Sequence, residues 1–367
     1  MSHGSKPPFR ADQVGSLLRP VALREGRAKA KQGEIGLEAL RAVEDRCIRE
    51  AVSKQEAVGL SAVTDGEFRR DWWHIDFLRD FNGVTAVIDP ASPLFHRADE
   101  PVPVLTVTDK LRRSRPVMVE PFKFLASVTE RTAKLCIPSP SMLHMRGGRP
   151  AIDRAAYPKL DEFWADAAQA YRDEIRDLAA AGCTYLQLDD VSFAYLCDEK
   201  IRDGYRKRGD DPEAAPRTYA DTINAALRER PPGMTVTIHT CRGNFKSTWM
   251  ASGGYEPVAE VVFGGLDVDG YFLEYDTERA GGFEPLRFVP KGKKVVLGLV
   301  TSKSPELEDK DTIKRRIAEA AKHMPLEDLC LSPQCGFSST HHGNKLTEDD
   351  QWRKLELVAE VAREVWG

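Results

Sequence analysis

The chain has 367 residues, of which 41% are hydrophobic and 30% are charged, and its formal net charge is -4. This composition excludes intrinsic disorder, collagen-like repeats and low-complexity sequence, because apolar residues are abundant and glycine and proline are scattered. The 57 acidic and 53 basic side chains provide no strong positive field, so we expect no nucleic-acid partner. Length alone leaves open whether the chain forms two domains or one α/β barrel.

The sequence is the kind expected of a cytoplasmic protein. It has no apolar run of about 18 residues, so no transmembrane helix and no membrane partner are expected. Residues 1–10 are polar and lack the apolar core of a signal peptide. The seven cysteines are an odd number in a large chain, which argues against a disulfide framework. In a reducing compartment most of them should be small buried apolar residues.

Short apolar or β-branched runs alternate with longer helical patterns along the chain. We predict eight strands, at residues 11–18 (the weakest), 61–67, 134–139, 185–190, 235–241, 270–276, 294–300 and 329–334. An amphipathic helix is predicted from Leu160 to Leu178, where apolar residues recur every three or four positions and Gly182 follows the last turn. The last helix is predicted to begin at Thr347, with Asp350 completing a variant capping box.

Strands that alternate with amphipathic helices indicate parallel βα units. Eight units predict a closed (β/α)8 TIM barrel of the α/β class, and the alternative is an open doubly wound sheet. Nucleotide-binding versions of the open sheet lose support, because the chain lacks GxGxxG after its first strand and has no GxxxxGK[ST]. No composition break marks a linker, so we predict one domain over residues 1–367.

Residues 81–124 depart from this pattern, since they are rich in Pro, Val and Thr and have no helical period. We predict an insertion here, after the second strand, with hairpin strands at 102–108 and 116–120. Such an insertion could act as a lid or provide contacts in a homo-oligomer.

Polar residues gather where the predicted strands end, which is the side of a barrel that carries catalytic groups. His239 and Cys241 lie two apart on one strand, so both side chains face the same side. With Glu274 on the sixth strand and Cys335 after the eighth, the set suits a tetrahedral zinc ion. Core cysteines, a satisfied histidine and a helix-capping carboxylate are the simpler explanations, and spacing leaves both readings open.

These residues resemble the zinc motifs in the C-terminal catalytic barrel of cobalamin-independent methionine synthase. The resemblance runs from about Phe9 to the end of the chain through five ordered motifs: VGS at 14–16, DGEFRRD at 65–71, QLDD at 187–190 (where the family usually has Asp-Glu-Pro), HTCRGN at 239–244 with Glu274, and PQCGF at 333–337. It implies a (β/α)8 barrel with zinc bound by His239, Cys241, Glu274 and Cys335. It also implies methyl transfer to homocysteine, whose thiol binds zinc as thiolate in place of Glu274 or a water.

The resemblance also implies how the amino acid part of homocysteine is held. Ser16 would receive the carboxylate, and Glu67 and Asp189 would hold the ammonium, whose three donors suit two acidic partners. Asp189, like Glu274, is thereby given a part in catalysis. The structural alternative pairs Glu67 and Asp189 with Arg69 or Arg242.

Three features depart from the family. The chain is one barrel where the synthase has two, so the resemblance leaves the methyl donor undetermined among folate, corrinoid, epoxide and others. Lys303 stands where the family has its proton-relay histidine in His-Ser-Pro, and His341 or His342 could replace it. Trp72 and Trp73 could either shape an apolar donor pocket or pack against the insertion.

The single barrel and the CGFSS signature at 335–339 look like the short methionine-synthase-like proteins, a group that includes the epoxyalkane:coenzyme M transferases. A sulfonate thiol would need basic residues, so Glu67 and Asp189 favour an amino acid thiol. The leading hypothesis is therefore a zinc-dependent homocysteine methyltransferase of methionine biosynthesis. Epoxide opening by a thiol and a non-catalytic metal- or corrinoid-binding protein are the alternatives. A uroporphyrinogen-type decarboxylase would not need His239, Cys241 and Cys335 together.

Overall fold

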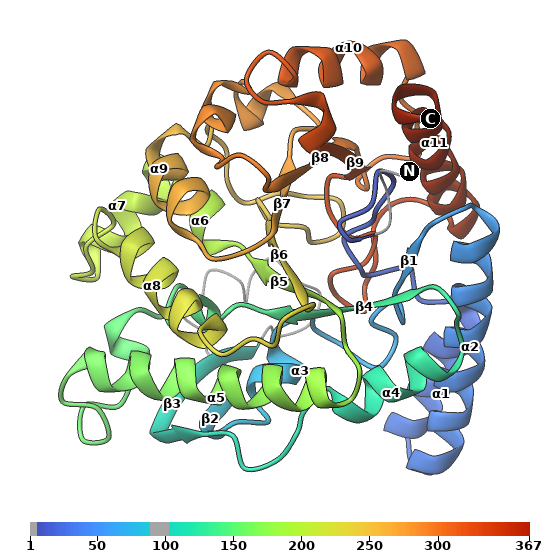
Figure 1. The fold of residues 1–367 in the computed structure, drawn as a ribbon. Helices are drawn as coiled ribbons and strands as arrows, with labels where there is room; N and C mark the ends of the chain where they lie inside the picture. The colour runs from blue at the N-terminus through green and yellow to red at the C-terminus, as the bar shows by residue number, and fades with distance from the viewer. Residues whose placement is uncertain (1–5, 89–102) are drawn as a thin grey trace.

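A curved parallel sheet forms the centre of the computed structural model, which describes residues 6–88 and 103–367. Figure 1 shows the strands curling around a central axis with the helices outside them. Each strand pairs in parallel with the next, as βα units require. The strand order is β1 (Ala62–Val63), β4 (Thr132–Pro138), β5 (Tyr185–Asp190), β6 (Thr235–Thr240), β7 (Gly270–Glu274), β8 (Lys294–Val300) and β9 (Leu329–Pro333). The predicted α/β class and barrel arrangement are confirmed.

The predicted first strand, 11–18, was wrong as a regular strand. Only Ala11 forms a bridge, which is parallel to Leu331 of β9. Beyond it the chain bends at Gly15, whose φ is +143°, and the amide of Leu17 donates to the carbonyl of Gly66 at 3.0 Å. The segment therefore lies beside β9, where the eighth strand of a barrel would be. Its backbone forms a hydrogen bond with the loop after β1 and no regular strand pairing with β1.

The helices that cover the sheet follow the predicted periodicity. Helix α5 begins at Leu160 and ends at Ala180, shortly before Gly182, and its apolar stripe is buried. Helix α10 (Lys310–Ala320) likewise buries an apolar stripe, formed by Ile313, Ile317 and Ala320. The helices are α1 (Val21–Lys31), α2 (Leu37–Ala57), α3 (Ile75–Leu78), α4 (Val119–Ser127), α5 (Leu160–Ala180), α6 (Ser192–Tyr195), α7 (Glu199–Lys207), α8 (Ala215–Leu227), α9 (Glu256–Gly265), α10 (Lys310–Ala320) and α11 (Glu348–Trp366).

The predicted insertion contains an antiparallel hairpin, although its strands differ from the prediction. The strands are β2 (Asn82–Ile88) and β3 (Pro103–Arg112), and β3 packs against α5 and α3 (Figure 1). Residues 116–120 are not a strand, because the amide of Met118 donates to Glu174 of α5 at 2.7 Å and α4 starts there. The part of the insertion at 89–102 lies outside the described residues. A lid or oligomer role stays a prediction.

The cysteines and the helices agree with the expectations from composition. All seven cysteines lie in the described part of the chain and are free thiols, which confirms that there is no disulfide framework. Among the described residues, no helix combines the length and apolarity needed to span a bilayer.

The predicted capping box is present at the start of α11. The Thr347 hydroxyl accepts from the Asp350 amide at 3.1 Å, and the Asp350 carboxylate accepts from the Thr347 amide at 2.9 Å. Thr347→Ala should lower the free energy of unfolding by about 1 kcal/mol, because an orphan amide of the first turn loses its acceptor. Urea denaturation measures this loss, and Thr347→Ser should largely retain wild-type stability. An unchanged midpoint for the alanine variant would contradict the role of the cap.

Candidate metal centre and substrate cavity

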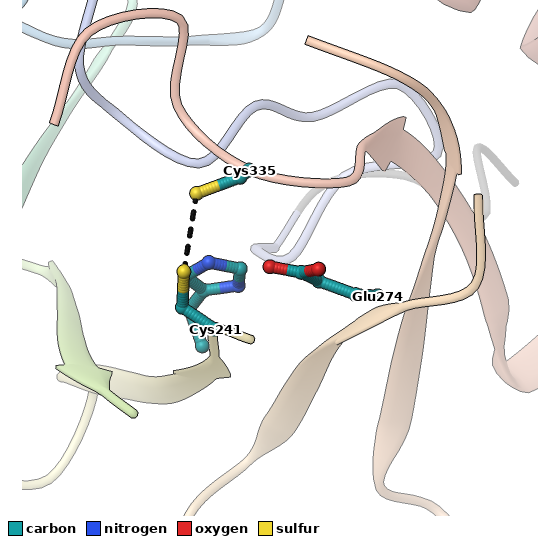
Figure 2. Close-up of side chains that lie close together, drawn as sticks. Cys241, Glu274 and Cys335 are labelled. Carbon is teal, nitrogen blue, oxygen red and sulfur yellow. Dashed lines mark hydrogen bonds between the residues drawn. The ribbon is translucent and has the colours of Figure 1, made fainter. Parts of the chain in front are cut away.

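The four predicted zinc-binding residues come together at the carboxyl end of the sheet. His239 lies in β6 and Cys241 just after it, Glu274 ends β7, and Cys335 follows β9 by two residues. All four are buried, and one ligand atom from each lies within 4.8 Å of the others. The sulfur atoms of the two cysteines are 3.4 Å apart, and Figure 2 shows the Glu274 carboxylate pointing toward them.

Local backbone features place the two cysteines. The amide of Cys241 donates to the carbonyl of Asp190 at 2.7 Å, which continues the β5–β6 pairing one residue beyond the strand. The loop after Cys335 passes directly against Ser16, and any Cβ at Gly336 would overlap the Ser16 hydroxyl. Glycine at 336 therefore allows the β9 loop and the Ser16 segment to share one side of the site.

The donor set fits a soft divalent metal. Both ring nitrogens of His239 are buried and have no hydrogen-bond partner within the described ranges. Buried polar atoms are normally satisfied, so a ligand at the imidazole accounts for this exception. One imidazole, two thiols and a carboxylate in contact are the donors that zinc prefers, and the two sulfurs have not formed a disulfide.

Electrostatics within the group favour a thiolate. A hydrogen bond with Cys241 holds the pKa of Cys335 well below its usual value, although burial opposes this. The same hydrogen bond and burial raise the pKa of Cys241. Burial lowers the pKa of His239, but its neighbours, led by Cys335, raise it above its ordinary value overall. One member of the cysteine pair is thus prepared to act as an anionic ligand before any cation arrives.

Glu274 is held by donors as well as by its place in the group. Its Oε1 accepts from the amide of Arg242 at 2.9 Å, and its Oε2 lies 3.3 Å from Nη2 of Arg279. Burial raises the pKa of this carboxyl group, while nearby cations act to lower it. The carboxylate therefore has contacts that do not depend on a metal.

A cavity of about 490 Å³ opens onto this group. Three of the four residues line it, and so do the predicted substrate residues Ser16, Glu67 and Asp189. Its other lining residues are mainly aromatic, apolar or basic, and they include Trp72, Trp73, His74, Arg146, Phe245, Lys246, Trp249, Met250 and Lys345. Residues predicted to bind metal and residues predicted to bind substrate thus share one space.

Glu67 and Asp189 form a buried acidic pair in this cavity. An oxygen of each and the sulfur of Cys136 lie within 4.8 Å of one another, and Oε2 of Glu67 has no hydrogen-bond partner in the described part of the chain. Gln187 donates to Oδ1 of Asp189 at 2.7 Å. Burial raises the pKa of Glu67 to about 7 and that of Asp189 to about 6. The pair can accept a cationic group, which would relieve the cost of burying two carboxylates.

The structure provides other partners for the arginines in the structural alternative. Arg69 pairs with Glu44 and Asp45 of α2, and the guanidinium of Arg242 lies 4.4 Å from the centroid of the Tyr255 ring.

Two contacts of the acidic pair were missed from the sequence. Arg70 lies 3.7 Å from Glu67. Cys136, predicted to be a core cysteine, is buried, but its sulfur belongs to the acidic pair. The DGEFRRD motif contained Arg70 but could not tell which of its two arginines faces inward. Cys136 lies in β4, and its side chain points to the same side of the sheet as the acidic pair.

The tryptophans line the cavity and also belong to the core. The ring of Trp72 stacks on Phe245, with centroids 6.5 Å apart, and meets His341 and His342 edge to face. Trp72 also belongs to the core cluster that contains residues of the hairpin, so packing against the insertion is confirmed for it, while a role in a donor pocket stays a prediction. His341 and His342 are not among the lining residues of the cavity.

The acidic pair predicts a pH dependence for binding an amino acid thiol. The pKa of Glu67 is raised from 4.5 to about 7, so this carboxyl group becomes protonated as the pH falls through 7 and no longer attracts an ammonium. The apparent affinity for homocysteine should therefore fall below about pH 7, relative to a thiol without an amino group at each pH. By the same linkage, the ligand-free fold should lose stability from Glu67 as the pH rises from 4.5 toward 7. A constant affinity ratio from about pH 5 to 8 would contradict the assignment.

Fold and site together define an α/β barrel with a His-Cys-Glu-Cys group at its strand ends, beside a cavity that contains a buried acidic pair. The model of the cobalamin-independent synthase catalytic domain matches residues 9–363, and the chain belongs to this family.

The similar proteins fall into two groups. The YxjH protein of Bacillus subtilis (strain 168) is 49% identical over 363 residues, which cover 98% of this chain and 96% of that protein. A 5-methyltetrahydropteroyltriglutamate--homocysteine methyltransferase of Thermosynechococcus vestitus is 22% identical, and the match covers 91% of this chain but 41% of that enzyme. The chain therefore spans less than half of the longer relative.

Solved structures agree with the family and the fold. A Listeria monocytogenes structure described as a vitamin-B12-independent methionine synthase has a TM-score of 0.81 and 39% identity, and the match covers 99% of this chain and 100% of that one. A B12-independent methionine synthase from Shewanella, solved with selenomethionine, has a TM-score of 0.72 at 20% identity with 97% of each chain covered, and shows the fold alone.

Proposed function

We propose that the protein is a zinc-dependent methyltransferase that alkylates the thiol of homocysteine to give methionine. One observation carries the proposal: the buried group of His239, Cys241, Glu274 and Cys335 opens onto the same cavity as a buried acidic pair. Membership in the cobalamin-independent synthase family supports methyl transfer as the reaction. The acidic pair supports an amino acid thiol as the acceptor.

The metal ligands in this proposal are the two cysteines, the histidine and Glu274. When bound there, zinc would supply a thiolate nucleophile at neutral pH, since coordination deprotonates a thiol whose ordinary pKa is about 8.5. Because the four ligands are buried, the effective dielectric constant around them is low, and this strengthens their electrostatic contacts with the substrate.

The other polar residues of the cavity bind and orient the amino acid. Glu67 and Asp189 accept hydrogen bonds from the ammonium, and Ser16 receives the carboxylate beside the loop of Gly336. Holding both ends of the amino acid fixes where its sulfur lies, and such positioning converts a bimolecular encounter into an oriented one. Trp72, Trp73 and Phe245 line the space where an alkyl donor would enter and limit its access to water.

The experiment that tests the proposal is a donor screen on the purified protein. It would be incubated with homocysteine or coenzyme M and, in turn, with methyltetrahydrofolate, methylcobalamin or a small epoxide, and thioether products would be identified by mass spectrometry. We expect methionine with a methyl donor, and none after the metal has been removed with a chelator. A coenzyme M thioether formed only with the epoxide would establish the alternative alkyltransferase. If no combination of donor and thiol gave a product, the proposal would fail and the alternative of a non-catalytic binding protein would be favoured.

A further inference from the structure

Glu274 differs from the other members of the metal group because cations also surround its carboxylate. Nη2 of Arg279 lies 3.3 Å from its Oε2. The positive charge of Lys303 acts to lower the pKa of Glu274, and it acts in the same direction on the pKa values of both cysteines. The carboxylate thus belongs to the metal group and also contacts Arg279, while the charge of Lys303 acts on it as well.

These two cations have hydrogen-bonding capacity that the structure does not use. Nζ of Lys303 and Nη1 of Arg279 are both buried, and neither has a hydrogen-bond partner among residues 6–88 and 103–367. Buried cationic donors without acceptors are unfavourable and uncommon. One of these donors belongs to the side chain that contacts Glu274, and the other to the lysine whose charge acts on Glu274, so both could serve an acceptor in another state of the site.

The backbone and side chains around these donors are fixed. Arg279 is held through Nη2 by both oxygens of Asp276, at 2.9 and 3.2 Å, and it lies 5.0 Å from the ring of Trp249. Lys303 follows Ser302, whose hydroxyl donates to Gln334 at 2.9 Å and whose carbonyl accepts from Asn344 at 2.7 Å. The Glu274 carboxylate could therefore move toward donors on residues that other hydrogen bonds already position.

We propose that Arg279 and Lys303 form a seat that receives the Glu274 carboxylate when the substrate thiolate takes its place among the metal ligands. The inference rests on the proposed function. In the exchange the thiol would lose its proton to solvent, and its sulfur would replace the Glu274 oxygen among the metal ligands. One anion replaces another at the metal, and the displaced carboxylate stays buried with its full charge. A buried unpaired carboxylate is costly, and pairing with Arg279 and Lys303 would offset that cost.

The seat makes Arg279 and Lys303 positioning residues for Glu274. They stabilise the state in which Glu274 has left the metal, and so they affect thiol entry more than metal binding. A purely structural role would predict the reverse, with metal affinity or folding lost first.

Cobalt-substituted protein provides a readout other than turnover, because each thiolate bound to Co²⁺ adds a sulfur-to-metal charge-transfer absorption. Homocysteine would be titrated into wild type, Lys303→Met and Arg279→Leu, with Lys303→Arg and Arg279→Lys as charge-retaining variants. Lys310→Met serves as the matched control, because Lys310 pairs with Glu360 and Glu364 on the surface. Affinity for the metal alone would be measured by chelator competition.

We expect the two neutral variants to bind metal alone with wild-type affinity and to bind homocysteine at least about tenfold more weakly, with the charge-retaining variants and the control unchanged. In a Glu274→Gln background, Lys303→Met should have no further effect on thiol binding, since no carboxylate needs a seat. Wild-type thiol affinity in both neutral variants would overturn the seat, as would loss of metal affinity before thiol is added. If wild type itself bound no metal or took up no thiol, the proposed function would fail instead.

Discussion

Cys335→Ser is expected to abolish stable zinc binding and, with it, measurable methyl transfer. The hydrogen bond with Cys241 holds the pKa of Cys335 well below its usual value, so Cys335 is the cysteine of the metal group that ionises more readily. Serine retains the size but offers a hydroxyl that is hardly ionised. Zinc affinity should fall by more than the roughly 10- to 100-fold that follows loss of a residue that only orients a metal ligand.

Metal analysis of the dialysed protein measures this result, with about one zinc per wild-type chain expected. Cys330→Ala is the control, because Cys330 is also buried and lies in β9, shortly before Cys335, but packs among Val14, Phe272 and Val296. It should lose some stability and keep its zinc. A Cys335→Ser protein with full zinc content and full activity would rule out the proposed site.

Glu67→Gln should weaken the binding of homocysteine by roughly 100-fold, while changing the binding of coenzyme M far less. The reason is that Glu67 lies close to Asp189, and its buried Oε2 has no hydrogen-bond partner in the described structure. A substrate ammonium would therefore add a second cation for the two carboxylates, beside Arg70. The amide keeps the shape of the side chain but removes its charge. A sulfonate thiol has no ammonium and gains nothing from the acid.

The measurement is the dissociation constant of each thiol for wild type, Glu67→Gln and Asp189→Asn. Glu162→Gln is a control, because Glu162 is an exposed residue that pairs with Lys110. Equal losses for both thiols in Glu67→Gln would count against an ammonium site and favour a structural role beside Arg70.

Local sequence was sufficient for most of the architecture. Alternating strands and amphipathic helices predicted the barrel, and the stripe of α5 and the cap of α11 lie where periodicity and capping residues placed them. His239 and Cys241 share a face because side chains two apart on a strand must do so. Strand-end positions added Glu274 and Cys335, and the resemblance to the synthase family then supported this set of four residues. The structure brings one ligand atom of each within 4.8 Å of the others, while zinc binding itself stays a prediction.

The errors occur where contacts between distant segments decide the backbone. Residues 11–18 have a strand-like composition, but after Ala11 their hydrogen bonds go to the loop that follows β1. Residues 116–120 alternate like a strand, yet amide bonds to Glu174 of α5 start a helix there. In both places the local preference was weak, so tertiary hydrogen bonds determined the result.

The sequence by itself determined the α/β class, the order of the βα units and the residue types available at the strand ends, because these depend on periodicity and spacing. Only the tertiary structure decided which cations lie near Glu274 and Glu67. It placed Arg70 near Glu67 and paired Arg69 with Glu44 of α2, and it left Lys303 and Arg279 each with an unused donor among the described residues. The physical reason is that burial and charge pairing are properties of three-dimensional neighbours, which segments far apart in the chain supply only after the barrel has closed.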